Sequence, residues 1–393
     1  MRKADKEMLR INNKLLILQE LKKWDLSRIE LAGITGLSNS TVSSLVRELT
    51  AENLVFEESV AASTGGRKPI IFSLNTSAVY VLTLKLLAHR IEAAILNLKL
   101  QTIRKQCCAY TDCNESVLKN AIETVLDGIL EDFPESEKRK LVGIGVSVPG
   151  LIDYANSMIL YSSHLNIANF NIKQYLQTII NLNVYLYKDV DALMLGTYAQ
   201  DNLRQNASYL YFYVGFGVGL SFLSNGKILQ LNRSGMEIGH VQLIPGGPLC
   251  NCGKYGCVET FVSEYAAQKR YMELSETENG VKAPPSFDEM VFKSNRGDQK
   301  CRQILSEQCE YLGRAIALAV NIFAPNEVLI GGPLSEIKWN ADEIIRRHVS
   351  ENVLSNFAAV SLKFTNTPEE ADFIGMANTI ISHEFFEAEA FAF

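Results

Sequence analysis

The spacing of apolar residues divides the chain into a helical front and a longer part in which strands and helices alternate. At the front, one apolar stripe predicts a helix over residues 6–23, and its members are Leu9, Leu15, Leu16, Leu18 and Leu21. Further along, apolar runs at 79–87, 90–98 and 102–110 predict three successive strands. A helical pattern at 116–132 and a buried strand at 141–150 follow. This part of the chain is predicted to be α/β.

The same order of elements returns in the second half. An apolar stretch at 208–228 reads as a pair of strands with an Asn225-Gly226 turn. A long helix at 301–323 and a glycine-ended strand at 327–332 come later. The repeated order predicts a duplicated α/β unit with a cleft between two lobes.

Between the front helix and the first strand, the residues 27–55 have the signals of a helix-turn-helix. Ser27 and Glu30 form a capping box, Gly36 ends the first helix, and Ser38 caps the second. On the second helix, Val42, Leu45, Val46 and Leu49 share the inward face.

The outward face of that second helix is polar near its start. We expect it to contact DNA through Ser38, Ser40, Thr41, Ser44 and Arg47. A β-hairpin is predicted next, and its tip carries Arg67 and Lys68 beside two glycines, as suits a wing that enters a minor groove. An ordinary helical hairpin with a polar surface is the alternative.

Charge and composition fit this division. Residues 1–78 have a net charge of +2, whereas the remainder has −8. The hydrophobic content of 47% and charged content of 21% are those of a globular protein, and no apolar run is long enough for a membrane span. We therefore expect a cytoplasmic protein, in which structural disulfides are disfavoured.

Four motifs give the chain a resemblance to the ROK family (repressors, open reading frames and kinases). They are GVSVPGLID at 145–153, EIGH at 237–240, CNCGKYGCVE at 250–259 and IGG at 330–332. The front end resembles the winged helix of the repressor branch, notably of its xylose-type repressors. The resemblance implies an N-terminal winged helix-turn-helix followed by a two-lobed, actin-like (ribonuclease H-like) fold. The expected domains are 1–76, a smaller lobe at 77–191 plus 372–393, and a larger lobe at 192–371.

The resemblance also implies a sugar site. Five polar residues match the family's sugar contacts: Asn166, Asp189, Glu237, His240 and Glu259. Asp189 stands where the kinase members have their catalytic base. The preceding residue, usually Asn, is Lys188 here. Carboxylates and an amide suit sugar hydroxyls, each of which both donates and accepts a hydrogen bond.

The residues that would bind ATP in a ROK kinase are absent. Lys85, Leu87 and His89 replace the Asp, Gly and Thr of the first phosphate loop. The second loop, Gly215-Phe216-Gly217-Val218-Gly219, lacks the usual threonine. We expect no enzymatic activity and a ligand-binding role for Asp189. The alternatives are a sugar kinase with an appended DNA-binding domain and a DNA-binding protein whose sugar site is vestigial.

Three clustered cysteines raise a separate question. Cys250, Cys252 and Cys257 follow His240, and their spacing is not the Cys-x-x-Cys of redox proteins. A disulfide would leave one sulfur unpaired. Together with the family resemblance, this predicts a structural zinc ion held by Cys3His, the closed arrangement of non-catalytic sites.

The function expected from the whole is a sugar-responsive repressor of a carbohydrate-utilisation operon, with xylose among the candidate sugars. The partners are operator DNA and a sugar in the interlobe cleft that releases the protein from DNA. A homodimer or homotetramer would match two winged helices to a two-fold operator.

Overall fold

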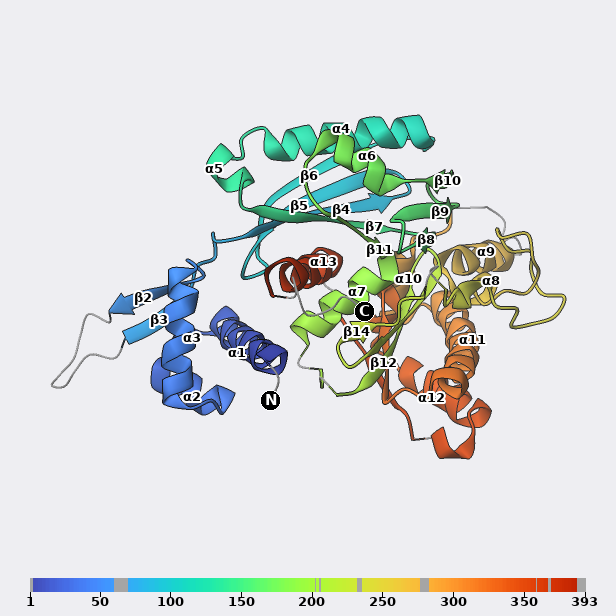
Figure 1. Cartoon of the computed structure of the whole chain (residues 1–393). Helices are drawn as coiled ribbons and strands as arrows, with labels where there is room; N and C mark the ends of the chain where they lie inside the picture. The colour runs from blue at the N-terminus through green and yellow to red at the C-terminus, as the bar shows by residue number, and fades with distance from the viewer. Residues whose placement is uncertain are drawn as a thin grey trace. The chain divides into compact units, whose positions relative to one another are not determined.

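The computed structural model describes residues 3–59, 70–201, 203–204, 206–231, 235–275, 283–357, 359–366 and 369–386. The chain divides into two compact units (Figure 1). The first unit comprises Met1–Ile152, Asn156–Tyr187 and Phe373–Phe393, and the second comprises Asp153–Ala155 and Lys188–Asp372. The finer division into three domains stays a prediction.

The front of the first unit is a three-helix bundle with a small sheet. Its helices are α1 (Lys3–Lys23), α2 (Arg28–Thr35) and α3 (Asn39–Ala51). Its strands are β1 (Leu26–Ser27), β2 (Val55–Ser59) and β3 (Ile70–Leu74), in the antiparallel order β1-β3-β2. This is a helix-turn-helix followed by a hairpin, as predicted.

The predicted helix boundaries are confirmed at the level of hydrogen bonds. The Ser27 hydroxyl accepts from the Glu30 N–H, and the Glu30 carboxylate accepts from the Ser27 N–H at 2.8 Å. Gly36 has φ 70° and donates its N–H to the carbonyl of Ala32, so it ends α2 in the left-handed conformation. The Ser38 hydroxyl accepts from the Thr41 N–H and begins α3.

The inward face of α3 is buried as predicted, but the α1 stripe is buried only in part, because Leu15 and Leu16 are half-buried and Leu9 is exposed. Leu9 is 53% exposed, whereas Ile17 and Leu21 are fully buried. At 100° per residue, Leu9 lies about 80° around the helix from Ile17. The core face of α1 therefore runs through Ile17, which the predicted stripe had left out.

A five-stranded sheet forms the rest of the first unit's core. Its order is β11 (Val184–Lys188), β7 (Leu141–Val148), β4 (Tyr80–Leu87), β5 (Arg90–Asn97) and β6 (Thr102–Ala109). β4 is antiparallel to β5 and parallel to β7, and β5 is antiparallel to β6. Helix α4 (Glu115–Leu130) covers one face and α13 (Ala371–Ile381) the other (Figure 1). The predicted strands are confirmed.

Smaller elements complete the first unit. They are α5 (Glu135–Lys138), α6 (Ile172–Ile179), the π-helical turn Ser382–Phe386 and a three-stranded sheet. The order of this sheet is β10 (Ile167–Phe170), β9 (Met158–Ser162) and β8 (Leu151–Asp153). The last residue of β8, Asp153, belongs to the second unit. This three-stranded sheet was not predicted.

The second unit has a five-stranded sheet of the same design. Its order is β14 (Lys227–Ile228), β13 (Val218–Ser224), β12 (Ser208–Val214), β15 (Glu327–Gly331) and β16 (Ser361–Phe364). The first three strands are antiparallel neighbours, and β12, β15 and β16 are parallel. Asn225 and Gly226, both with positive φ, turn β13 into β14, so the predicted strand pair is three strands.

Alternation along β12 determines which helices cover each face of this sheet. Leu210, Phe212 and Val214 join one core with α11 (Gln299–Phe323), whereas Tyr209 and Tyr211 join another with α7 (Asp189–Gln200). The other helices are α8 (Glu259–Val262), α9 (Glu264–Ser275), α10 (Phe287–Asn295), α12 (Ala341–Asn352) and the 3-10 turns Ile238–His240, Pro333–Glu336 and Ser355–Phe357. Among the described helices, none is both long and apolar enough to cross a membrane.

Candidate functional site

The start of α3 presents the side chains expected to meet DNA. Ser38, Ser40, Ser44 and Arg47 are exposed, and Thr41 is half-buried. The Ser38 hydroxyl lies 2.8 Å from those of both Ser40 and Thr41, which fixes a small hydroxyl cluster at the helix start. The other two predicted contacts, Arg67 and Lys68, lie outside the described residues.

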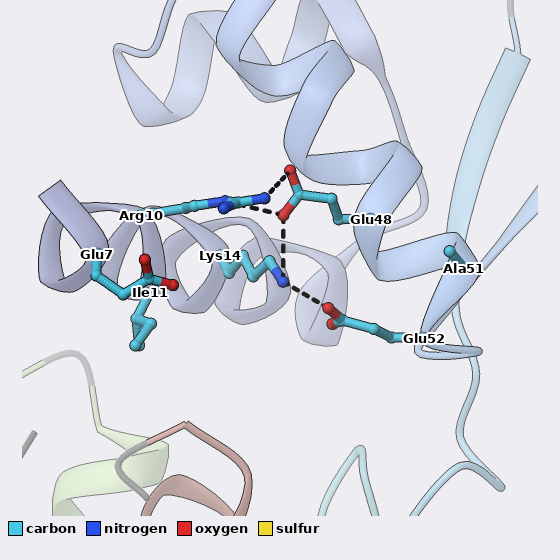
Figure 2. A pocket seen from close by; sticks show the side chains of 7 residues that line it. All are labelled: Glu7, Arg10, Ile11, Lys14, Glu48, Ala51 and Glu52. Carbon is cyan, nitrogen blue, oxygen red and sulfur yellow. Dashed lines mark hydrogen bonds and ion pairs between the residues drawn. The ribbon is translucent and has the colours of Figure 1, made fainter. Parts of the chain in front are cut away.

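Ion pairs from α1 hold the far end of α3. Figure 2 shows Arg10 and Lys14 reaching from α1 to Glu48 and Glu52 across a cavity of about 400 Å³. Arg10 contacts both carboxylate oxygens of Glu48, at 2.8 and 3.1 Å, and Lys14 lies 2.6 Å from Glu52. The Arg10 hydrogen bond holds the pKa of the Glu48 carboxyl below its usual range. These pairs fix the angle between α1 and the helix that presents Arg47.

In the second unit, the four predicted metal ligands lie together. His240, Cys250, Cys252 and Cys257 bring their ligand atoms within 4.8 Å of one another. The Cys252 and Cys257 sulfurs are 3.7 Å apart, and the Cys250 sulfur is 3.6 Å from His240 Nδ1. Zn–S bonds of about 2.3 Å in a tetrahedron place two sulfurs about 3.8 Å apart. The donors and their spacing therefore fit a metal ion.

The loop around this cluster depends on a glycine. Gly256 has φ 73°, and a Cβ there would lie 1.7 Å from the carbonyl oxygen of Ile244. That carbonyl lies two residues beyond Gln242, which pairs with Cys257 in an isolated β-bridge. Only glycine allows this close approach, and the approach brings Cys257 back to His240.

Two of the predicted sugar contacts border the metal cluster. Glu259 opens α8, and its Oε1 is 4.0 Å from the Cys250 sulfur. Its Oε2 lies 2.9 Å from where a Cβ on Gly217 would stand and 3.4 Å from that of Gly239. The glycine-rich turn thus leaves room for a carboxylate. Glu237 immediately precedes the 3-10 turn that carries His240.

Asp189 begins α7, and its carboxyl is set apart by burial. One carboxylate oxygen accepts from the Val190 N–H at 2.8 Å. Burial raises the pKa of Asp189 to about 6, against the opposing effect of the Lys188 ammonium. Lys188 is itself buried and lies 2.6 Å from Glu237.

A buried carboxylate next to Asp189 was not predicted. Asp191 accepts hydrogen bonds from the hydroxyls of Tyr154 and Ser221, and burial raises its pKa. The signal in the sequence was the pair of acids two residues apart in Lys-Asp-Val-Asp. Because both occupy the first turn of a helix, both gain from its dipole.

Asn166 belongs to the first unit. It has φ 49° and lines a cavity of about 470 Å³ together with Ala88, His89, Asn114 and His164 among others. His89 therefore borders an open space. The other replaced loop residues, Lys85 and Leu87, lie in β4 opposite Glu92 and Arg90 of β5. Asp189, Glu237, His240 and Glu259 all belong to the second unit.

Comparisons with known proteins place these features in context. The chain is 27% identical over 376 residues to the xylose repressor of Bacillus spizizenii, covering 95% of this chain and 96% of that protein. It is 25% identical to the transcriptional dual regulator NagC of Escherichia coli, covering 87% and 84%.

Solved structures show the same fold. A ROK family transcriptional regulator described as a homologue of the E. coli MLC protein matches with a TM-score of 0.76 and 21% identity, over 95% of this chain and 96% of that one. A ROK family glucokinase from Streptomyces griseus matches with a TM-score of 0.66 and 17% identity, over 76% and 98%.

The kinase match covers less of this chain than the regulator match does. The sequence model of the ROK family matches residues 82–382, which include both five-stranded sheets and the metal cluster. The chain therefore belongs to the ROK family.

Proposed function

We propose that the chain is a transcriptional repressor that a sugar releases from its operator. The observation that carries this proposal is the pairing of two sites in one chain. The capped helix α3 presents hydroxyls and an arginine in the first unit. The second unit contains a cluster of carboxylates and the loop that carries His240, Cys250, Cys252 and Cys257, which we call the metal knot. The names of the relatives, a xylose repressor and a transcriptional dual regulator, support it.

DNA is bound by the start of α3 in this proposal. Ser38, Ser40, Thr41, Ser44 and Arg47 supply short donors and one cation, and Arg67 and Lys68 of the hairpin tip add two cations. Short side chains let the helix approach base edges, and each cation neutralises a phosphate.

The test of the DNA site is a titration of fluorescent operator DNA, cloned from the region upstream of the gene. Arg47→Ala should weaken binding about ten-fold and reduce the slope of log K against log salt by about 1. Lys269→Ala, an exposed cation on α9, is the control and should change neither. Equal slopes for the two variants would remove Arg47 from the interface.

The sugar is bound by Asp189, Glu237 and Glu259, with Asn166 as a further contact. Their oxygens accept from ring hydroxyls. If Nδ1 of His240 binds the metal, Nε2 remains to donate to the ligand. The sugar acts as an inducer because it binds the DNA-released conformation more tightly.

The metal is proposed to be structural Zn²⁺ bound by His240, Cys250, Cys252 and Cys257. Three thiolates and an imidazole fill a tetrahedral shell, so the ion supplies rigidity and no open position for water. Because Glu259 lies beside Cys250, the knot fixes one wall of the sugar site.

A homodimer or homotetramer is proposed to present paired winged helices to a two-fold operator. Light scattering behind size-exclusion chromatography, with and without a DNA duplex of one or two half-sites, tests this. A monomer on the two-half-site duplex would contradict it.

A second candidate, a sugar kinase, is favoured by Asp189, whose pKa of about 6 suits a general base. Against it stand Lys85, Leu87 and His89 in the first phosphate loop. A coupled ATPase assay with a panel of hexoses and pentoses separates the two. We expect no sugar-dependent ATP turnover, and clear turnover would replace the non-enzymatic assignment.

A further inference from the structure

A buried ion pair occupies the ligand region of the second unit. Among the described residues, Lys188 is the one lysine that is buried, with 5% of its surface exposed. Its ammonium lies 2.6 Å from Glu237 Oε1 and donates more weakly to the Gly235 carbonyl at 3.4 Å. It ties the residue before α7 to the segment that leads to His240.

Around this pair, the described acids outnumber the one described cation. Asp189, Asp191 and Glu237 interact electrostatically with one another and with Lys188. The phenols that face them, Tyr154 and Tyr213, are neutral near pH 7, because the ordinary pKa of a phenol is about 10. Burial raises the pKa of both further, that of Tyr213 to about 12. In the part of the chain that the structure describes, one positive charge therefore stands against three carboxyl groups.

This balance bears on the charge of the ligand. A phosphate or carboxylate placed here would meet the carboxylates, while the one ammonium is already committed to Glu237. An ammonium group would be repelled by Lys188 but attracted by Asp189 and Asp191, so the charge balance disfavours anionic ligands rather than cationic ones. A ligand hydroxyl carries no charge and so meets no repulsion here. One carboxylate oxygen of Asp189 accepts from the Val190 N–H, and the other oxygen can accept a hydrogen bond from the ligand hydroxyl.

Resting on the proposed sugar response, we propose that the Lys188–Glu237 ion pair determines ligand specificity and makes the site select uncharged polyhydroxyl compounds over their phosphorylated derivatives. Removing either partner leaves a buried charge without its compensation. That charge then favours a ligand group of the opposite sign.

The test compares ligands that share a skeleton and differ in charge. The probes are glucose, glucosamine and glucose 6-phosphate, and xylose with xylose 5-phosphate. Release of fluorescent operator DNA by the full-length protein gives an apparent affinity for each probe. The variants are Lys188→Met, Glu237→Gln and the double variant, with Lys188→Arg as the charge-conserving control.

The wild type should respond better to glucose than to glucose 6-phosphate, and better to xylose than to xylose 5-phosphate. Lys188→Met should raise the affinity ratio of glucosamine to glucose about ten-fold, and Glu237→Gln should raise that of glucose 6-phosphate to glucose by a similar factor. The double variant and Lys188→Arg should return both ratios toward wild type. A purely structural role would lower all affinities together and leave the ratios unchanged.

Two outcomes would overturn the inference. One is a wild type that responds best to a phosphorylated sugar. The other is unchanged ratios in both single variants, provided that zinc content and thermal stability show them to be folded. If no probe of any charge releases DNA or shifts the melting temperature of the wild type, the proposed sugar response itself fails, and this inference fails with it.

Discussion

The two five-stranded sheets have the same strand order and differ at the turn between their first two strands. In the first unit, a two-residue turn of Ala88 and His89 joins β4 to β5. In the second, the three residues Gly215, Phe216 and Gly217 join β12 to β13. The framework is repeated, but the turns are chemically unlike.

This difference indicates that, in a duplicated fold, the turns between strands rather than the strands themselves determine what each unit can bind. The glycine turn lets the Glu259 carboxylate stand beside Gly217, and the metal cluster lies behind it. The equivalent turn in the first unit carries an imidazole that borders a cavity. The second unit should therefore depend on its knot, whereas the first should fold without one.

The strongest way to break this comparison is to remove the metal. Cys257→Ser takes away one of four ligands, and structural zinc contributes about 10–16 kcal/mol in small sites. We expect loss of bound zinc, faster hydrogen exchange over residues 241–259 and loss of the sugar response. Exchange in β4, β5 and β6 should not change. Mass spectrometry measures both metal content and exchange.

The matched control for that variant is Cys107→Ser, an exposed thiol on β6. It should keep its zinc and its response to sugar. A Cys257→Ser protein that lost zinc and still responded normally would contradict the proposed role of the knot as a wall of the sugar site.

A second test sharpens the role of glycine within the knot. Gly256→Ala places a methyl group 1.7 Å from the Ile244 carbonyl, so we expect a loss of more than about 3 kcal/mol in unfolding free energy. Gly253→Ala has a similar φ of 84° but open space around it, and should cost about 1 kcal/mol. Urea denaturation of both variants measures the difference, and equal losses would contradict the crowding.

The pH dependence of stability gives an intermediate effect, confined to the second unit. The folded pKa of Asp189 is about 6, above its value of 3.8 when exposed. The folded protein therefore binds the proton more tightly, and stability falls as pH rises from about 4 to 6. Asp189→Asn should reduce this fall, with the remainder due to Asp191, whose pKa is also raised, and should be more stable than wild type by about 2 kcal/mol at pH 7.5. Urea titrations at pH 5 and 7.5 measure it.

The control for that measurement is Asp132→Asn, whose side chain is 88% exposed. It should keep the wild-type slope between the two pH values. An Asp189→Asn protein with the wild-type slope would show that another group is responsible.

The smallest effect is expected in the first unit, at the exposed pairs of α1 and α3. Glu48→Gln breaks the contacts with Arg10 and Lys14 and should cost at most about 1 kcal/mol. The loss should shrink in 1 M salt, because screening weakens exposed pairs. Glu7 lines the same cavity. Glu7→Gln serves as the control and should change the free energy of unfolding less than Glu48→Gln does. A loss that is unaffected by salt would contradict an exposed ion pair.

Local signals allowed the winged helix-turn-helix and the main strands of both five-stranded sheets to be predicted. The capping box at Ser27, the left-handed Gly36 and the inward face of α3 each depend on residues within a few positions, so the sequence alone determines them. The ligand set of the metal cluster was also predictable, because its four residues span only 240–257.

Features that depend on distant contacts escaped prediction. The Lys188–Glu237 pair joins residues 49 positions apart, and nothing near either one predicts the other. The β8–β10 sheet has strands of three to five residues, too short for a clear alternation. Leu9 was assigned to the core by type, although its angle around α1 turns it outward.

Helix α13 contacts two parts of the first unit that are distant in the sequence. Its first two residues, Ala371 and Asp372, belong to the second unit, and the rest belongs to the first. Near its far end, Asn378 accepts a hydrogen bond from Lys22 of α1 at 3.2 Å. On the same helix, Met376 and Ile380 pack against Gly145 and Gly143 of β7. A helix is stiff, so within the first unit α13 joins the five-stranded sheet and the helix that packs against α3 to one rigid element.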